Sequence, residues 1–315
     1  MPTAPRPAPT RPDPSADQFR EPRRDDCPWC GSTRLRTRVR TSDPVRRAPG
    51  VFEVDECREC SHAFQNPRLT ADVLALHLRR PHGGHRPAAL RAAARAVPPD
   101  AEPESWLDVG TGHGHFPEEA RQVHPYTCFD GLDPTPRVER AREAGRVEEA
   151  HRGTLTDPAV TGRLRGRYDV VSMFHHLAHC PDPRAELRAA LTVLRPGGHL
   201  LIELTDPGCL FGALLGRWWA AYDQPRRLHL LPLPNLLAEL AAAGCAIVAV
   251  DRGGPHVPYD LTGALSLALA RRHPAPPWVR VPLLVIATAL DHALAPLLRR
   301  TRFSNAYRVL ARRPA

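Results

Sequence analysis

The sequence contains no lysine, so all 43 of its basic residues are arginine. Together with abundant alanine and proline, this indicates a compositional bias of the whole chain. The arginines are scattered along the sequence, so the net charge of +9 does not by itself predict nucleic-acid binding. We expect most of these side chains to be solvated at the surface.

Cysteine is too scarce for a disulfide scaffold, with eight residues in a chain of 315. The N-terminus shows no charged start followed by an apolar stretch and a small-residue cleavage site, so we expect a cytoplasmic protein. Residues 1–25 combine proline with arginine and aspartate and offer little to bury, which predicts a disordered leader. The remaining length allows one full α/β domain plus smaller additions.

Half of the cysteines form two Cys-x-x-Cys pairs separated by 26 residues. Two such turns can offer four thiolates in the tetrahedral arrangement that zinc accepts, which favours a zinc ribbon over residues 26–68. A redox Cys-x-x-Cys and a pair of disulfides are the alternatives. A zinc ion with four protein ligands has no open position, so its expected role is structural. The expected ligands are Cys27, Cys30, Cys57 and Cys60.

A glycine-rich segment, residues 106–116, is the feature around which the chain is organised. Two apolar residues and an acid lead into three glycines at alternate positions, a pattern typical of a strand, a tight loop and a helix start. Glycine there permits positive φ angles and lets a ligand approach the backbone. The dinucleotide-binding spacing Gly-x-Gly-x-x-Gly is not met, because its sixth position is His115. The acid and the glycines are Asp108, Gly110, Gly112 and Gly114.

This Asp-x-Gly-x-Gly-x-Gly segment resembles motif I of the class I S-adenosylmethionine-dependent methyltransferases, and the resemblance extends from about residue 106 to 250. It implies an α/β fold, a Rossmann-like, doubly wound, mostly parallel seven-stranded sheet, here preceded by the zinc ribbon. Strand and helix patterns alternate from 105 to 205, which also predicts a parallel sheet with its ligand at the carboxyl ends of the strands. The expected divisions are a helical connector at 69–98, the S-adenosylmethionine-binding domain at 99–252, and C-terminal helices with a final strand at 253–315.

The resemblance also predicts the residues that bind S-adenosylmethionine. Asp133 ends the second expected strand and would accept hydrogen bonds from the ribose hydroxyls, with Asp130 as the fallback. Past the third strand the family contacts adenine, often through an acid that this chain lacks, so backbone amides or Asp157 would replace it. The expected cofactor-binding residues are Asp108, Gly110, Gly112, Gly114, Asp133, Thr154, Leu155, Phe174 and His175.

The apolar run at residues 168–174 predicts a central parallel strand. The residues after it resemble the post-strand-4 motif of small-molecule methyltransferases, except that Ala178 replaces a common glutamate. Neutral histidine is the natural base for a hydroxyl acceptor, and each candidate has a structural alternative, such as capping a helix or binding backbone. The candidate catalytic bases are His176, His179 and His229, with His175 behind them.

Two segments lie outside these motifs. Residues 208–233 are rich in aromatics and would either cover the substrate or simply pack. Residues 261–300 are apolar over nearly the length of a membrane span, but Asp291 and two prolines interrupt them, which predicts amphipathic helices packed on the domain. Attachment to a membrane surface, helped by flanking arginines, is the alternative. The apolar pattern predicts a final strand at 307–312, and the resemblance implies that this strand pairs antiparallel at the sheet edge.

The motifs together favour a methyltransferase that acts on a small molecule, such as a sugar, a lipid or a secondary metabolite, with oxygen as the acceptor atom. Alignment of the reactants can supply about 7–11 kcal/mol of the barrier and a general base about 3–5 kcal/mol, so an unidentified base does not defeat this function. One alternative is an RNA methyltransferase that docks through the ribbon, although the Asn/Asp-Pro-Pro-aromatic motif for base amines is absent. The other is a non-catalytic zinc-binding adapter.

Overall fold

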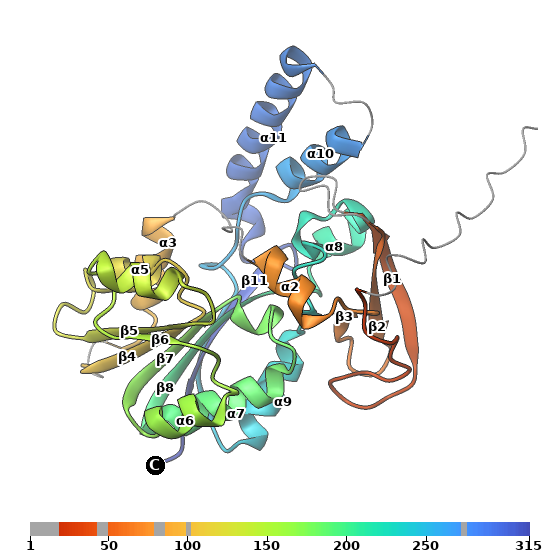
Figure 1. Cartoon of the computed structure of the whole chain (residues 1–315). Coiled ribbons are helices and arrows are strands. Elements are labelled where there is room, and N and C mark those ends of the chain that lie inside the picture. Colours follow the sequence, from red (N-terminus) through yellow and green to blue (C-terminus); the bar gives the residue numbers. More distant parts are fainter. Residues whose placement is uncertain (1–18, 43–49, 79–85, 99–101, 272–275) are drawn as a thin grey trace, which may run out of the picture.

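The computed structural model describes residues 19–42, 50–78, 86–98, 102–271 and 276–315. These residues form a seven-stranded sheet with the order β10-β11-β8-β7-β4-β5-β6 and a four-stranded sheet with the order β1-β2-β3-β9 (Figure 1). The strands of the larger sheet are β4 (Ser105–Val109), β5 (Cys128–Asp133), β6 (Ala150–Arg152), β7 (Tyr168–Phe174), β8 (Leu194–Thr205), β10 (Ala246–Asp251) and β11 (Ala306–Arg312).

Helices cover both faces of the larger sheet. Along β4, Trp106 packs in a core with α3 and α4, whereas Leu107 packs in a second core with α6, α7 and α9. Successive strand residues point to opposite faces, so one short strand contributes to both cores. The helices are α2 (Ala71–Leu78), α3 (Pro87–Ala94), α4 (His115–Ala120), α5 (Arg137–Glu143), α6 (Pro158–Leu164), α7 (Pro183–Val193), α8 (Leu210–Leu215), α9 (Leu233–Ala242), α10 (Asp260–Arg271) and α11 (Pro277–Leu298).

The predicted α/β fold with a mostly parallel sheet is confirmed. Strands β4, β5, β6, β7 and β8 pair in parallel, and β7 covers the residues predicted for it. The expected edge position of the final strand is wrong, because β11 runs antiparallel between β8 and β10. The physical reason is burial: all but the last residue of β11 are buried, whereas the residues of β10 are largely exposed and suit an edge.

The N-terminal module is joined to the larger domain through a shared sheet. Its strands are β1 (Leu35–Thr41), β2 (Phe52–Cys57) and β3 (Ala63–Gln65), and β9 (His229–Leu230) from the aromatic segment pairs with β3. Residues 19–25 of the predicted leader also belong to this module, since Arg23 contacts Asp55 at 2.6 Å. Residues 1–18, and the helix break predicted near 81–84, lie outside the described residues.

Helices α10 and α11 form a hairpin that rises from one end of the molecule (Figure 1). The carboxylate of Asp291 accepts hydrogen bonds from the amides of Leu261 and Thr262, which ties the two helices together at their base. Most other side chains of α11 are exposed, so it does not pack along the domain as the sequence predicts. Within the described residues it is the one helix long and apolar enough to cross a membrane, by length and composition alone.

Candidate active site

The glycine loop connects β4 to α4. Its glycines all have positive φ, with values of 75° at Gly110, 55° at Gly112 and 73° at Gly114, a region that favours glycine. A Cβ at Gly110 would lie 2.6 Å from Nδ1 of His176, whereas a Cβ at Gly112 would meet nothing within 4 Å. Gly110 therefore makes room for a histidine, and Gly112 faces space that a ligand can use.

Asp133 ties this loop to the end of β5. Its Oδ2 accepts a hydrogen bond from the amide of Gly112 at 3.0 Å, and its Oδ1 accepts one from the amide of Thr135 at 2.8 Å. The hydroxyl of Thr135 also donates to Oδ1. The acceptor capacity left for a ligand is therefore on Oδ2, which has one partner. The position at the carboxyl end of β5 suits the ribose role of Asp133, which stays a prediction.

The fallback residue, Asp130, is engaged within the fold. The hydroxyl of Tyr168 donates to it at 2.8 Å and the amide of Glu149 at 3.0 Å. Burial would raise the pKa of Asp130, but hydrogen bonds from His151 and Tyr168 outweigh it and lower that pKa. This carboxylate therefore fixes the sheet, which leaves Asp133 as the better ribose candidate.

Asp108 lies beneath the loop as a buried acid. The hydroxyl of Ser172 donates to its Oδ1 at 2.7 Å and itself accepts from Nε1 of Trp106 at 2.9 Å. Burial raises the pKa of Asp108 to about 7. These two hydrogen bonds link β4 to β7 just before the loop. Asp108 therefore fixes the strand ends from which the loop starts.

The predicted adenine residues follow β6. Leu155 is fully buried in the core, so its side chain does not face a ligand. The hydroxyl of Thr154 lies 3.2 Å from that of Thr156. Asp157 caps α6 by accepting from the amide of Ala159 at 2.9 Å. An adenine contact would therefore use the backbone of Thr154 and Leu155, and it stays a prediction.

The end of β7 carries Phe174 and His175. The ring of Phe174 packs on that of Phe116, with centroids 4.4 Å apart. His175 has a left-handed φ of 57°, and its Nδ1 is buried without a hydrogen-bond partner among the described residues. Burial, together with the positive charge of Arg227, lowers the pKa of His175 to about 3. The imidazole is therefore neutral at pH 7 and free to accept a proton, although it is a weak base.

His176 faces the opposite way, beneath the glycine loop. Its Nε2 lies 2.9 Å from Oε1 of Glu186, whose side chain is almost fully buried. Burial alone would lower the pKa of His176, but Cys180 and Glu186 outweigh it and raise that pKa well above the usual value. The imidazole is therefore a cation at neutral pH. In this state it supports the loop and does not act as a base.

The two other candidate bases are engaged in contacts within the fold. Nδ1 of His179 donates to the carbonyl of Arg226 at 2.8 Å. His229 is buried against the ribbon, where its Nδ1 lies 3.0 Å from Nε2 of His62. Burial lowers the pKa of both His179 and His229 to about 4. Of the four predicted histidines, only His175 lines the pocket described next.

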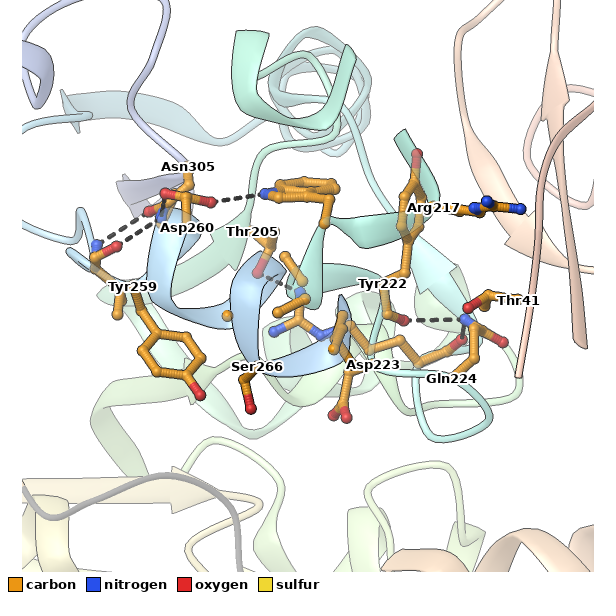
Figure 2. A pocket seen from close by; sticks show the side chains of 18 of the residues that line it. Thr41, Thr205, Arg217, Tyr222, Asp223, Gln224, Tyr259, Asp260, Ser266 and Asn305 are labelled. Carbon is orange, nitrogen blue, oxygen red and sulfur yellow. Dashed lines mark hydrogen bonds between the residues drawn. The ribbon is translucent and has the colours of Figure 1, made fainter. Parts of the chain in front are cut away.

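A pocket of about 340 Å³ lies at the carboxyl ends of β7 and β8 (Figure 2). Besides these strand ends, four parts of the chain line it: the aromatic segment, α10 with the residues before it, the end of β1, and the start of β11 with Asn305. Trp219 and Tyr222 line the pocket and are also buried, so the aromatic segment both packs and covers the cavity. His175 at the end of β7 and Thr205 at the end of β8 form the wall nearest the glycine loop.

Polar groups are arranged around this cavity. Arg227 donates to the hydroxyl of Thr205, and burial lowers the pKa of its guanidinium. Asp260 accepts from Nε1 of Trp219 at 2.7 Å and from Asn305 at 2.6 Å (Figure 2). Burial raises the pKa of Asp260 to about 6. The pocket therefore offers a cation and fixed polar groups within largely aromatic and aliphatic walls, which suits a small organic acceptor.

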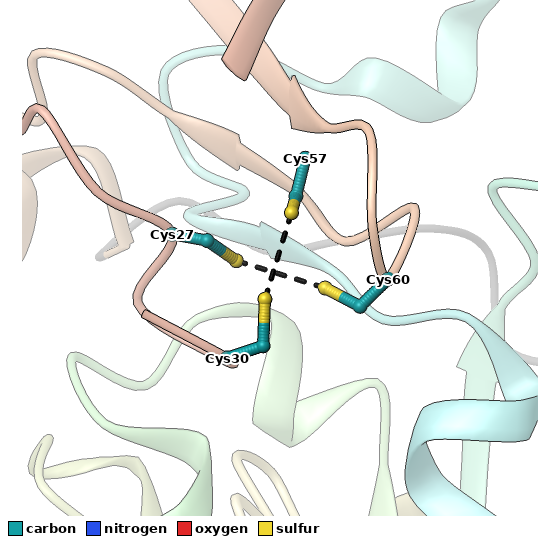
Figure 3. Close-up of side chains that lie close together, drawn as sticks. All are labelled: Cys27, Cys30, Cys57 and Cys60. Carbon is teal, nitrogen blue, oxygen red and sulfur yellow. Dashed lines mark hydrogen bonds between the residues drawn. The ribbon is translucent and has the colours of Figure 1, made fainter. Parts of the chain in front are cut away.

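The predicted metal ligands converge on one point (Figure 3). Sγ of Cys27 lies 3.7 Å from Sγ of Cys60, and Sγ of Cys30 lies 3.6 Å from Sγ of Cys57. Four sulfurs about 2.3 Å from one zinc ion lie about 3.8 Å apart. The geometry therefore fits tetrahedral zinc, and the cysteines are free of disulfides.

The cysteine cluster is fastened to the larger domain. Asn235 of α9 donates to the carbonyl of Cys60 at 2.9 Å, and the guanidinium of Arg184 lies 4.6 Å from the ring centre of Trp29. The ribbon strand that leaves this cluster ends at Thr41, which lines the pocket. The N-terminal module thus contributes a wall of the candidate acceptor site.

The sequence motifs do not identify several pocket residues. Arg227, Tyr259 and Asp260 lie in the aromatic segment and the C-terminal part, and no motif marks them. Thr205 could have been predicted as a pocket residue, because it ends a predicted parallel strand and ligands bind at the carboxyl ends of such strands.

Comparisons with known proteins agree with this geometry. A family model described as "Methyltransferase domain" matches residues 82–250. Ubiquinone biosynthesis O-methyltransferase of Marinobacter nauticus is 29% identical over 128 residues, covering 39% of this chain and 54% of the relative. Its counterpart in Aeromonas salmonicida is 35% identical over 156 residues, covering 48% of this chain and 65% of the relative. This chain thus spans between about half and two thirds of the length of these relatives.

Solved structures support the fold. A chain in the complex between the Haloferax volcanii Trm112 methyltransferase activator and a methyltransferase aligns with a TM-score of 0.50 at 17% sequence identity. The alignment covers 73% of this chain and 90% of that chain. At this level of identity the similarity concerns the fold alone.

Proposed function

Because this chain belongs to the class I S-adenosylmethionine-dependent methyltransferases, we propose that it methylates an oxygen of a small molecule held in the pocket beside the glycine loop. One observation carries the proposal: β4 and β7 pair in parallel, so the glycine loop and His175 leave adjacent strand ends. Neighbouring strands lie about 4.8 Å apart. A donor on the loop and an acceptor in the pocket would thus meet at His175.

The donor would be held by groups already placed at these strand ends. The space beside Gly112 would admit the ligand against the loop backbone, and Asp133 would accept from the ribose. Phe174 and His175 would close the site on the side of the pocket. When bound, S-adenosylmethionine supplies a methyl group attached to a positively charged sulfur. Because of this charge, the sulfur is already an activated leaving group.

The chain's main task is then to align the acceptor oxygen. A well-oriented pair of reactants can lower the barrier by about 7–11 kcal/mol. The aromatic walls would position the acceptor, and Arg227 would stabilise negative charge on an acceptor oxygen that loses its proton. His175 is neutral and faces the pocket, so it would receive that proton, with a modest effect because its pKa is low.

The relatives named above are O-methyltransferases, which supports oxygen as the acceptor atom over the RNA-docking and adapter alternatives. A transfer assay with a labelled methyl group on S-adenosylmethionine and a panel of small phenols, sugars and amphipathic alcohols tests the proposal. We expect label to enter at least one hydroxyl compound, and Arg227→Met to reduce this transfer while donor binding persists. Transfer to RNA instead, with a steep salt dependence, would contradict it.

We infer that the four cysteines hold a structural zinc ion. Their sulfur separations support this assignment, and four thiolate ligands would leave no position for a reacting group. The ion would hold the two turns from which the ribbon strands start. Elemental analysis of the purified protein should give about one zinc per chain, and a metal-free protein with intact pocket geometry would overturn the inference.

A further inference from the structure

The hairpin of α10 and α11 carries a long apolar surface that nothing in the described part of the chain covers. Trp278 is 77% exposed and begins this surface. Only Ala287 and Asp291 of α11 are buried. Soluble monomers rarely expose apolar patches of this extent, and such patches mark interaction sites. The exposed flank of α11 consists mainly of Val281, Val285, Ile286, Leu290, Leu294 and Leu297.

The exposed charged side chains of α11 and of the residues after it are all positive. Arg280 lies near the start of α11, and Arg299, Arg300 and Arg302 follow its end, all exposed. Residues 252–315 contain only two acids, Asp260 and Asp291, and both are buried and hydrogen-bonded inside the hairpin base. The exposed charges on α11 itself and on the residues from 299 to 302 are therefore positive.

This combination selects among the partners that could cover the flank. Two copies of the chain meeting through α11 would bring like charges together, which disfavours association. A bilayer with anionic lipids offers both an apolar interior and a negative surface. Tryptophan at the start of the flank suits the membrane interface. The 22 residues of α11 extend about 33 Å, so the flank can make a long contact.

We propose that the α10–α11 hairpin is a lipid-docking element that lays the exposed flank of α11 on an anionic bilayer surface. Docking is favoured over spanning because α10, with 12 residues, is too short to cross a bilayer beside α11. The same hairpin lines the acceptor pocket through Gly263, Ser266 and Leu267 of α10. This last step rests on the proposed methyl transfer. A pocket beside a lipid-docking helix favours an acceptor with a hydrophobic tail.

Vesicle flotation with the full chain tests the proposal directly. Vesicles of phosphatidylcholine with about 30% phosphatidylglycerol should bind the protein at least about tenfold more tightly than phosphatidylcholine alone. Val285→Glu with Ile286→Glu should reduce binding more than about tenfold. The matched control is Ile247→Glu with Val248→Glu, two adjacent exposed apolar residues on β10, which should leave binding unchanged. Arg280→Glu should weaken binding about fivefold or more.

Each other outcome overturns the proposal. Equal vesicle binding by the α11 double variant and the wild type would remove α11 from the contact. A wild-type dimer in sedimentation that the α11 variant loses would assign the flank to a second copy of the chain. Absence of both vesicle binding and a dimer would overturn the proposal as well, since neither a bilayer nor a second copy would then cover the flank. The assay needs neither donor nor acceptor, so its failure leaves the methyl-transfer proposal standing.

Discussion

Nε2 of His176 lies 2.9 Å from Oε1 of Glu186, while Nδ1 of the same ring faces Gly110. The pair thus supports the glycine loop from below and links it to α7. The pKa of His176 is raised well above its usual value. The folded protein therefore holds this proton more tightly than the unfolded chain does. This contribution to stability is complete below about pH 6.5 and is lost as pH rises through the raised pKa.

Glu186→Gln should remove that pH dependence. The substitution leaves a buried imidazole without its carboxylate, so we expect the free energy of unfolding to fall by about 3 kcal/mol at pH 6. The loss should shrink toward high pH, where the wild type also loses the ion pair. Urea unfolding at pH 6 and at pH 9 measures both values. A negligible loss at pH 6 would contradict a charged His176.

Glycine substitutions should separate folding from donor binding. Gly110→Ala places a Cβ 2.6 Å from His176, so it should destabilise the protein and abolish S-adenosylmethionine binding. Gly112→Ala meets no atom, so it should keep most of the stability, apart from about 1 kcal/mol of backbone strain, yet weaken binding. Gly145→Ala has a similar φ and open surroundings and serves as the control. Calorimetry and thermal unfolding give the two readouts, and wild-type donor affinity in Gly112→Ala would remove that residue from the site.

Loss of zinc should affect the acceptor side of the site more than the donor side. Cys57→Ser should release the metal and loosen the strand that ends at Thr41 in the pocket wall. We expect zinc content to fall below about half, with donor affinity within about twofold of wild type. Cys128→Ser is the control, since that thiol is exposed and outside the cluster. Full zinc content in Cys57→Ser by elemental analysis would disprove the assignment.

His175→Ala should lower turnover without weakening donor binding. A general base typically contributes 10²- to 10⁴-fold, and the low pKa of this histidine places the expected loss at or below the lower limit of that range, about tenfold to 100-fold. Because His175 titrates near pH 3, its state does not change between pH 5 and 9, and it should add no inflection to the rate profile there. His229→Gln is the comparison, since that ring lies in the ribbon contact. Equal turnover in His175→Ala and wild type would exclude His175 as the proton acceptor.

Local patterns in the sequence predicted the central sheet well. The run at residues 168–174 became β7 because both faces of that strand are buried, which leaves a continuous apolar signature. The glycine loop was equally clear, since its φ angles exclude most other residues. The contact between Phe64 and His229, by contrast, joins residues far apart in the chain through β3 and β9. No periodicity in the sequence indicates such a pairing, so the sequence could not show that His229 belongs to the ribbon interface.

The acceptor pocket was harder to predict for the same reason. Arg227, Asp260 and Thr41 come from three separate parts of the chain and meet only after the ribbon and the hairpin pack on the sheet. The sequence also could not show that α11 is exposed, because an apolar helix has the same composition whether it is buried or unpartnered. The structure decides this by showing which of its side chains have neighbours.

The most direct measurement is calorimetry of the purified protein with S-adenosylmethionine and its demethylated product. The account predicts that the wild type binds both ligands and that Asp133→Ala loses about tenfold to 150-fold in affinity, since hydrogen bonds to a charged group contribute about 1.5–3 kcal/mol. Glu148→Gln, an exposed acid away from the loop, should bind like the wild type. Absence of binding by a folded wild type, or full affinity in Asp133→Ala, would contradict the account.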